Sequence, residues 1–257
     1  MWWWREVVGL VLAGECEGCG RGRVVLCEGC WAALCGGVPG RVRPGAEAVG
    51  LPPVHAAAAY RDVVRAVLLA HKERGALALA GPLGVALAGA VRDAVGGRGA
   101  VLVPVPSARG TVRARGHDAM RRIALAAAGE LRRKGTAARV AAVLRQRRPV
   151  ADQAGLSSPQ RLANLAGALE VVPGGERLLA HGSGRVVLVD DLMTTGATLT
   201  EAARAVRTSF TGARVYGVAA GEATEERPAT GAHGPGVPPL RAAVVAAPSD
   251  SFETNRN

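Results

Sequence analysis

Aromatic residues are scarce in this sequence. Phe, Tyr and Trp together make up 3% of the 257 residues, whereas hydrophobic residues as a class make up 49%. That apolar content is sufficient for a folded core at this length, so the core must be built of Ala, Val and Leu. The same scarcity leaves few side chains on which nucleic-acid bases could stack, which argues against recognition of bases.

The sequence also lacks the usual marks of a membrane or exported protein. We find no apolar run of the length needed to span a bilayer. The start has no basic segment before its apolar stretch, carries Glu6 within it, and places Glu15 before Cys16, where a lipoprotein signal needs a small residue. We therefore expect an amphipathic first helix whose tryptophans pack on the main domain or on a partner. The protein is expected to be cytoplasmic, without stable membrane insertion.

Acidic residues are fewer than basic ones, at 21 against 32. The net charge is +11, with arginine as the dominant charged residue. Such a balance is typical of proteins that bind phosphates, nucleotides or nucleic acid. A compositional bias toward arginine on a solvated surface is the alternative interpretation.

Four of the five cysteines form two C-x-x-C motifs. These are Cys16 with Cys19 and Cys27 with Cys30, separated by a short loop. Paired motifs of this spacing in a cytosolic chain predict a structural Zn²⁺ site with a closed tetrahedral shell of four thiolates. Redox-active or unligated cysteines remain the alternative. Cys35 is a spare thiol that we expect to be buried.

The stretch that organises the chain is VVLVDDLMTTGAT, residues 186–198. Its continuous apolar start predicts a strand buried on both faces of a parallel sheet. Asp190 and Asp191 then fall at the carboxyl end of that strand, where ligands of such sheets bind, and adjacent strand residues point to opposite faces. Thr194, Thr195, Gly196, Ala197 and Thr198 follow as hydroxyls and backbone N–H groups before a helix expected at residues 199–206, a combination that attracts phosphate.

This stretch resembles the phosphoribosyl-pyrophosphate (PRPP) motif of the type I phosphoribosyltransferases. The resemblance implies that Asp190 and Asp191 hold the ribose 2′ and 3′ hydroxyls, and that Thr194 through Thr198 hold the 5′-phosphate. It also implies that Asp190 and Asp191 act in catalysis, by offsetting positive charge that develops on the sugar. In purine-salvage members an Asp at the position of Thr194 serves as general base, so this loop offers no carboxylate for that task.

Two further segments resemble the ComF/GntX family of phosphoribosyltransferase-like proteins. Residues 60–72 form an expected helix, in which His71 is expected to be solvated or to cap the helix end. The helix ends at Lys72, which is either a partner of the helix dipole or a ligand for pyrophosphate. Residues 100–106 predict a strand ending in Val-Pro-Val-Pro, followed by a basic loop and then Arg115-Gly116 before an expected helix at residues 119–131. The candidate pyrophosphate ligands of that loop are Arg109, Arg113 and Arg115, with a solvated basic face as the alternative.

A third basic segment lies between two expected strands, at residues 139–144 and 169–172. It resembles the family's Arg…Gln-x-Gly-Leu…Arg…Asn run, and its place in the chain matches the flexible catalytic loop of type I enzymes. The residues that carry this resemblance are Arg148, Gln153, Arg161 and Asn164. A mobile basic loop without a catalytic part is the alternative.

The predicted fold class is α/β: a type I phosphoribosyltransferase-like doubly wound parallel sheet preceded by a small zinc-binding module. We expect the first helix, zinc module and linker at residues 1–50 and the main domain at residues 51–221, with its last strand at residues 213–219. Residues 222–257 are expected to form a flexible tail, within which residues 240–247 could add an edge strand.

The resemblance implies a PRPP-binding protein that is a phosphoribosyltransferase if it is catalytic. Such a glycosyltransferase displaces pyrophosphate from the sugar with a nitrogen nucleophile, and Mg²⁺ accompanies the diphosphate. The alternative function is a non-catalytic component of competence and DNA uptake that binds single-stranded DNA or the competence helicase machinery and retains the ribose-phosphate site.

Overall fold

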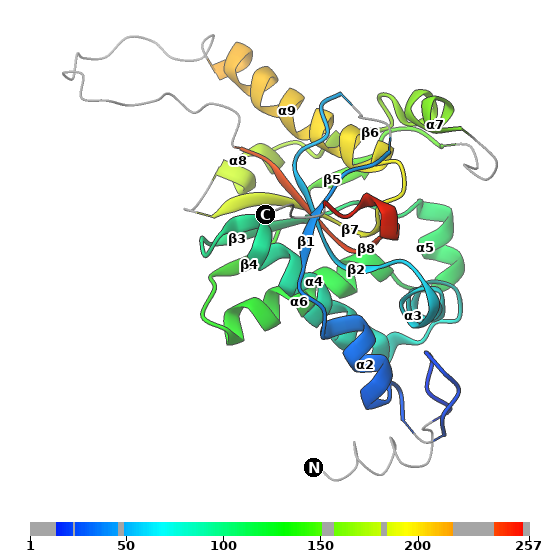
Figure 1. The fold of residues 1–257 in the computed structure, drawn as a ribbon. Coiled ribbons are helices and arrows are strands. Elements are labelled where there is room, and N and C mark those ends of the chain that lie inside the picture. Colours follow the sequence, from blue (N-terminus) through cyan, green and yellow to red (C-terminus); the bar gives the residue numbers. More distant parts are fainter. Residues whose placement is uncertain are drawn as a thin grey trace.

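A computed structural model describes residues 14–22, 24–45, 49–150, 157–180, 184–217 and 239–253 of the chain (Figure 1). These residues form an α/β fold around a six-stranded sheet of order β1-β2-β8-β7-β3-β4. Strand β1 is antiparallel to β2, and every other neighbouring pair in the sheet is parallel. The strands are β1 (Gly40–Val42), β2 (Val54–Ala59), β8 (Arg241–Ala247), β7 (Arg185–Leu192), β3 (Ala100–Pro104) and β4 (Ala138–Val140).

Helices cover both faces of this sheet. In Figure 1, α4 (Ala80–Val95) and α6 (Ala119–Arg133) lie below it, and the long helix α9 (Ala197–Gly217) lies above it. The lower layer also contains α2 (Glu28–Cys35), α3 (Asp62–Glu73) and the 3₁₀ turn η1 (Leu77–Leu79). Further helical elements are α5 (Arg109–Arg115), α8 (Gly175–Ala180) and the 3₁₀ turn η2 (Ser249–Ser251).

A small substructure, here called the hood, follows β4. It consists of the antiparallel pair β5 (Leu144–Gln146) and β6 (Leu169–Val171) together with helix α7 (Ser158–Leu165). The expected strand at residues 139–144 is therefore two short strands that belong to different sheets. The hood packs against α9 through β6 and α7, beside the carboxyl end of β7.

Small side chains allow the layers to approach closely. Strand β8 has the sequence RAAVVAA, and six of its seven residues are buried. Gly84 of α4 lies so close to α6 that an added Cβ would stand 2.5 Å from the side chain of Ala126. The aromatic-poor composition is therefore matched by thin, closely packed layers rather than by large side chains.

Two sequence expectations about the end of the chain are wrong. Residues 213–217 continue α9 rather than forming a strand, so the helix overrides the strand preference of Val215 and Tyr216. Residues 241–247 lie in the middle of the sheet, between β2 and β7, rather than in a tail or at an edge. Their continuous apolar run is the pattern of a strand buried on both faces. The polar, Gly- and Pro-rich segment before them led us to assign them to a tail.

The stretch Leu77–Val95 is long and apolar enough, by length and composition, to cross a membrane. This differs from our expectation that no apolar run reaches that length. However, 56% of its apolar window is buried, and α4 packs against α6, β2 and β8. Such burial is compatible with a core helix of a globular domain.

Candidate functional site

The adjacent acids Asp190 and Asp191 lie near the carboxyl end of the central strand β7. Asp191 is buried, with 7% of its surface exposed, whereas Asp190 is half-buried. The backbone N–H of Asp191 donates a hydrogen bond to Oδ1 of Asp190 at 2.9 Å. As expected for neighbouring strand residues, the two carboxylates therefore meet different surroundings.

A lysine from another element compensates one of these acids. Nζ of Lys72, at the end of α3, lies 2.7 Å from Oδ2 of Asp191. Burial by itself would lower the pKa of Lys72, but attraction by Asp191 and Asp190 outweighs it and raises that pKa. Lys72 is thus a partner of the acid pair, a role that neither sequence-based alternative described.

The pKa of the second acid, Asp190, is shifted upward. Burial raises the pKa of Asp190 to about 8, and repulsion by the neighbouring Asp191 adds to the effect, although Lys72 opposes it. Two acids this close share a proton more readily than separate carboxylates do. Carboxyl groups accept hydrogen bonds from hydroxyls, so two adjacent acids can bind two neighbouring hydroxyl groups of a ligand.

The loop after β7 turns sharply into α9. Gly196 has a φ of 74°, a left-handed conformation that favours glycine. An added Cβ there would also lie 3.0 Å from the side chain of Leu51. The hydroxyl of Thr195 accepts a hydrogen bond from the backbone N–H of Ala197 at 3.5 Å, at the first residue of the helix. The predicted strand–loop–helix unit is present, with α9 beginning two residues earlier than expected.

The end of α3 forms three consecutive ion pairs with three different parts of the molecule. Beyond the contact between Lys72 and Asp191, Glu73 binds Arg115 of α5 at 2.6 Å, and Arg74 binds Glu17 of the cysteine-rich segment at 2.8 Å. The preceding residue, His71, is 1% exposed, so it is not the solvated or capping histidine that the sequence led us to expect. Its ring nitrogens face the backbone carbonyls of Ala76 at 3.1 Å and Ala119 at 3.4 Å.

A cleft of about 490 Å³ opens beside the acid pair. Its lining includes five of the predicted site residues, namely Lys72, Arg115, Asp190, Asp191 and Thr198. It also includes polar residues that sequence analysis did not select, namely Ser107, Thr111 and Gln146. These come from the loop after β3, from α5 and from β5, which all reach the carboxyl end of the sheet.

Among the described side chains of α5, Arg115 lines the cleft but Arg113 does not. Arg113 is exposed on α5 and does not contribute to the lining. Arg109 begins α5, but its side chain lies outside the described part of the chain. The expected basic loop is a short helix, in which Arg113 and Arg115 stand two residues apart and therefore on roughly opposite faces of the helix.

The hood places one arginine beside the loop between β7 and α9. Nη1 of Arg161, from α7, lies 3.4 Å from the hydroxyl of the exposed Thr194, while Nε of Arg161 is buried without a hydrogen-bond partner. Arg148 instead donates to the backbone carbonyls of Asn164 and Ala166, both at 2.9 Å, and so fixes the end of α7. Asn164 is half-buried in α7, and Gln153 lies outside the described residues.

The hood is attached to α9 by a pair that sequence analysis missed. The buried carboxylate of Glu201 accepts a hydrogen bond from the backbone N–H of Leu169 at 2.9 Å, and Arg204 donates to the Leu169 carbonyl at the same distance. Glu201 and Arg204 also bind each other. Together they satisfy both backbone groups of Leu169, as a neighbouring strand would. An acid and an arginine three residues apart on a helix are common on solvated faces, so the sequence carried no distinct signal.

The four cysteines of the two C-x-x-C motifs come together. Sγ atoms of Cys16, Cys19, Cys27 and Cys30 all lie within 4.8 Å of one another. The Sγ atoms of Cys19 and Cys27 are 3.6 Å apart, far beyond the 2.05 Å or so of a disulfide. Four sulfurs at about 2.3 Å from a tetrahedral ion would be separated by roughly 3.8 Å, so the cluster is compatible with structural zinc.

The thiols of this cluster differ in acidity. Burial opposes ionisation of Cys16, but backbone N–H groups, that of Cys27 first, lower its pKa to about 6. The pKa of Cys27 is also lowered, by hydrogen bonds from Cys30, whereas burial and its sulfur neighbours raise that of Cys30. Thiolates crowded together in this way favour a cation among them.

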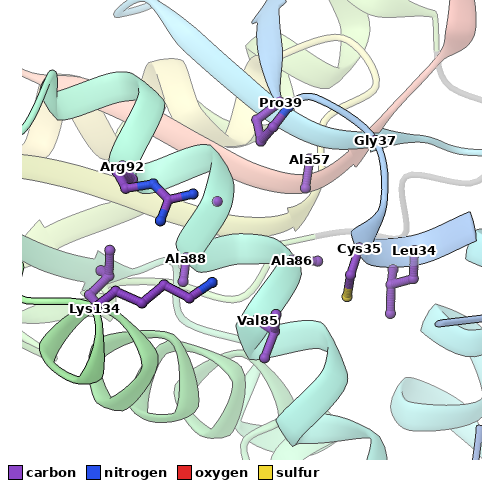
Figure 2. Close-up of a pocket in the computed structure, with 12 residues that line it drawn as sticks. Leu34, Cys35, Gly37, Pro39, Ala57, Val85, Ala86, Ala88, Arg92 and Lys134 are labelled. Atoms are coloured by element: carbon purple, nitrogen blue, oxygen red, sulfur yellow. The ribbon is translucent and has the colours of Figure 1, made fainter. Parts of the chain in front are cut away.

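A second cavity lies between α2, α4 and the end of α6 (Figure 2). Figure 2 shows Leu34 and Cys35 of α2 at one side of it, with Arg92 and Lys134 at the other. Its volume is about 100 Å³, the space of roughly three waters, so it cannot hold a phosphorylated sugar. Cys35 is half-buried there, its Sγ lies 3.6 Å from the Pro82 carbonyl, and burial raises its pKa to about 11.

Comparison with known proteins does not assign this chain to a family. No protein-family model matches the chain, and no curated protein shows a significant match to it.

Proposed function

We propose that this chain is a type I phosphoribosyltransferase-like protein that binds PRPP in the cleft beside Asp190 and Asp191. The observation that carries the proposal is the position of the acid pair. It ends a central parallel strand and is followed at once by a hydroxyl-rich loop at the N-terminus of a long helix. Ligands of parallel sheets bind at this edge, and helix N-termini bind phosphate.

Each part of such a ligand is assigned its own polar groups around the acid pair. Asp190 and Asp191 bind the ribose hydroxyls. The loop from Thr194 to Thr198, of which Thr198 lines the cleft, binds the 5′-phosphate. Lys72 and Arg115, which also line the cleft, bind the diphosphate, and the diphosphate carries the Mg²⁺. The volume of about 490 Å³ falls in the range typical of small-molecule sites.

Transfer of the phosphoribosyl group to a nitrogen acceptor is the reaction proposed for this site. The two acids stabilise positive charge that develops on the sugar as the bond to pyrophosphate breaks. Thr194 stands where a general base would act in purine salvage, so the acceptor must lose its proton to another group or arrive without it. The hood contributes Arg161 beside this loop and excludes water from the activated sugar.

Structural zinc completes the proposal. The four thiolates leave no position open for a substrate, so Zn²⁺ in this cluster stabilises the segment around residues 16–30 rather than taking part in the reaction.

Calorimetric titration with PRPP and Mg²⁺ tests the binding site. We expect saturable binding to the wild-type protein, and a loss of at least tenfold in affinity in Asp190→Asn and in Asp191→Asn. Asp93→Asn is the matched control, because it removes the same charge from α4, outside the cleft. Absence of PRPP binding to the wild-type protein, or equal losses in all three variants, would refute the proposal.

Transfer is tested separately. Wild-type protein with PRPP and Mg²⁺ is incubated with a series of nitrogen bases, and released pyrophosphate is measured. Release with one base, lost in Asp190→Asn/Asp191→Asn, would establish a transferase. PRPP binding without release for any nitrogen acceptor would limit the function to binding.

A further inference from the structure

Three arginines gather at the opposite edge of the same sheet. Arg185 begins β7, Arg241 begins the neighbouring strand β8, and Arg98 lies two residues before β3 on the other side of β7. The register pairs Arg185 with Ala100 and Arg241 with Val187, so the three side chains start from adjacent strands near their amino ends. In Figure 1 these strand starts lie to the left, whereas α5 and α7, which border the cleft, lie to the right.

These arginines are close enough to repel one another. Burial lowers the pKa of Arg185, and repulsion by Arg98 and Arg241 lowers it further. Nε of Arg185 is buried and has no hydrogen-bond partner. Within the described ranges of the chain, no carboxylate forms an ion pair with any of the three. By contrast, the ion pairs of Lys72, Arg115 and Arg74 compensate every charge at the end of α3.

An uncompensated cluster of like charges costs folding free energy, and a bound anion removes that cost. The geometry of the row limits which anion fits. Adjacent strands are about 4.8 Å apart and rise about 3.3 Å per residue, so the two-residue offset between Arg185 and Arg241 separates their starting points by roughly 8 Å. Arg98 extends the row on the other side of β7, so the row is longer than one phosphate. A linear chain of phosphates can contact all three arginines, because each guanidinium binds one phosphate through paired N–H groups.

We propose that the row of Arg98, Arg185 and Arg241 binds the phosphodiester backbone of a nucleic acid strand. The row contacts phosphates and not bases. No aromatic side chain lies in the described segments around its three arginines, residues 96–101, 184–188 and 239–244, so no platform for base stacking is present there. Arg139 of β4 lies next along the same edge, but its guanidinium is engaged by the carbonyl of Leu178. This surface does not depend on the PRPP site, which faces the other way.

The test is a binding titration of full-length protein with a fluorescent 20-residue oligo-dT, repeated with oligo-U, at several salt concentrations. In wild type the logarithm of the binding constant should fall linearly with the logarithm of salt concentration. In the triple variant Arg98→Gln/Arg185→Gln/Arg241→Gln, we expect at least tenfold weaker binding at low salt. The slope should also fall in magnitude by roughly 2, because each lost phosphate contact on a single strand accounts for about 0.7. Equal losses of affinity for oligo-dT and oligo-U in the triple variant show that the row binds the phosphodiester backbone common to both. A loss confined to one of them shows whether the row binds DNA or RNA.

The matched control is Arg65→Gln/Arg92→Gln/Arg122→Gln, which removes the same charge from exposed positions on three helices. Equal losses in both triple variants would overturn the proposal, since net charge alone would then explain binding. Absence of binding to wild type would overturn it too. Binding of inorganic polyphosphate and of vesicles containing phosphatidylserine is measured as well. If the row variant binds either of these more weakly than wild type but binds oligonucleotides equally well, the proposal is also overturned.

Two further measurements separate this proposal from others. The row variant should unfold at the same temperature as wild type or higher, because the substitutions relieve repulsion, whereas a merely structural role predicts a lower temperature. Calorimetry with PRPP should be unchanged in this variant, so failure of the nucleic-acid surface and failure of the PRPP site give distinguishable results.

Discussion

The cysteine cluster and the carboxylate cleft both bring ionisable side chains together, but in opposite ways. The four cysteines lie within fifteen consecutive residues, and their segment has little core of its own beyond Leu34 of the following helix. The cleft takes Lys72, Arg115 and Asp191 from elements far apart in the sequence, on a sheet whose central strands are buried on both faces. A cluster whose residues are close in the sequence depends on its ligand for stability. A cluster whose residues are brought together by the fold depends on the hydrophobic core beneath it.

The largest expected effect is loss of the metal from the cysteine cluster. In Cys16→Ser/Cys19→Ser, bound zinc should fall from one ion per chain to none, because two of four ligands are gone. Structural zinc in such small modules contributes on the order of 10 kcal/mol to local folding, so residues 14–35 should become sensitive to protease. Metal content by mass spectrometry and limited proteolysis are the measurements.

The single variant Cys35→Ser is the control, since Cys35 lies outside the cluster. It should retain full zinc content and the wild-type cleavage pattern. A metal-to-protein ratio unchanged in the double variant would contradict the zinc assignment. PRPP binding that survives loss of the metal would show that the cleft stands on its own core.

The same contrast explains what could be predicted from the sequence. The cysteine cluster and the acid-pair loop were predictable because each is encoded within one short segment. The partnership of Lys72 with Asp191 was not, since it depends on how α3 and β7 are placed by the sheet. The central position of β8 was also missed, because register and strand order are set by packing that no local pattern records. His71 was misjudged for a similar reason, as its burial arises from the contact of α3 with the start of α6.

The next largest effect is expected in Lys72→Met, which leaves the carboxylate of Asp191 buried without its cation. Breaking a buried pair commonly costs 3–5 kcal/mol. However, 37% of the Lys72 side chain is exposed, so water screens the interaction and we expect a loss of about 1–2 kcal/mol. Chemical denaturation measures this, and PRPP affinity should fall as well.

Lys134→Met is the matched control. Lys134 also ends a helix and also binds a buried acid, Glu130, but Arg133 remains to compensate that acid. Its loss should cost less than about 1 kcal/mol and leave PRPP affinity unchanged. Equal costs for the two lysines would mean that the cleft charges are no more coupled to folding than ordinary surface pairs.

A smaller effect is expected from pH. Burial, with repulsion from Asp191, raises the pKa of Asp190 to about 8, so the folded state holds this proton more tightly than the unfolded chain does. The associated stability is fully present below about pH 4 and is lost as pH rises through about 8. The melting temperature of wild type should therefore fall more between about pH 6 and pH 8.5 than that of Asp190→Asn. Parallel melting curves for the two proteins in this window would contradict the raised pKa.

The smallest effect concerns the contact between the two regions. Arg74 of α3 binds Glu17 of the cysteine-rich segment at 2.8 Å, but 56% of the Arg74 side chain is exposed. Exposed pairs contribute about 0.2–1 kcal/mol, so Arg74→Ala and Glu17→Ala should each change stability by about 0.5 kcal/mol, with a coupling of the same size in the double variant. PRPP affinity should not change, because Lys72 keeps its own partner. A loss of threefold or more in affinity in either variant would mean that the end of α3 transmits the state of the cysteine cluster to the cleft, and that the two regions act as one.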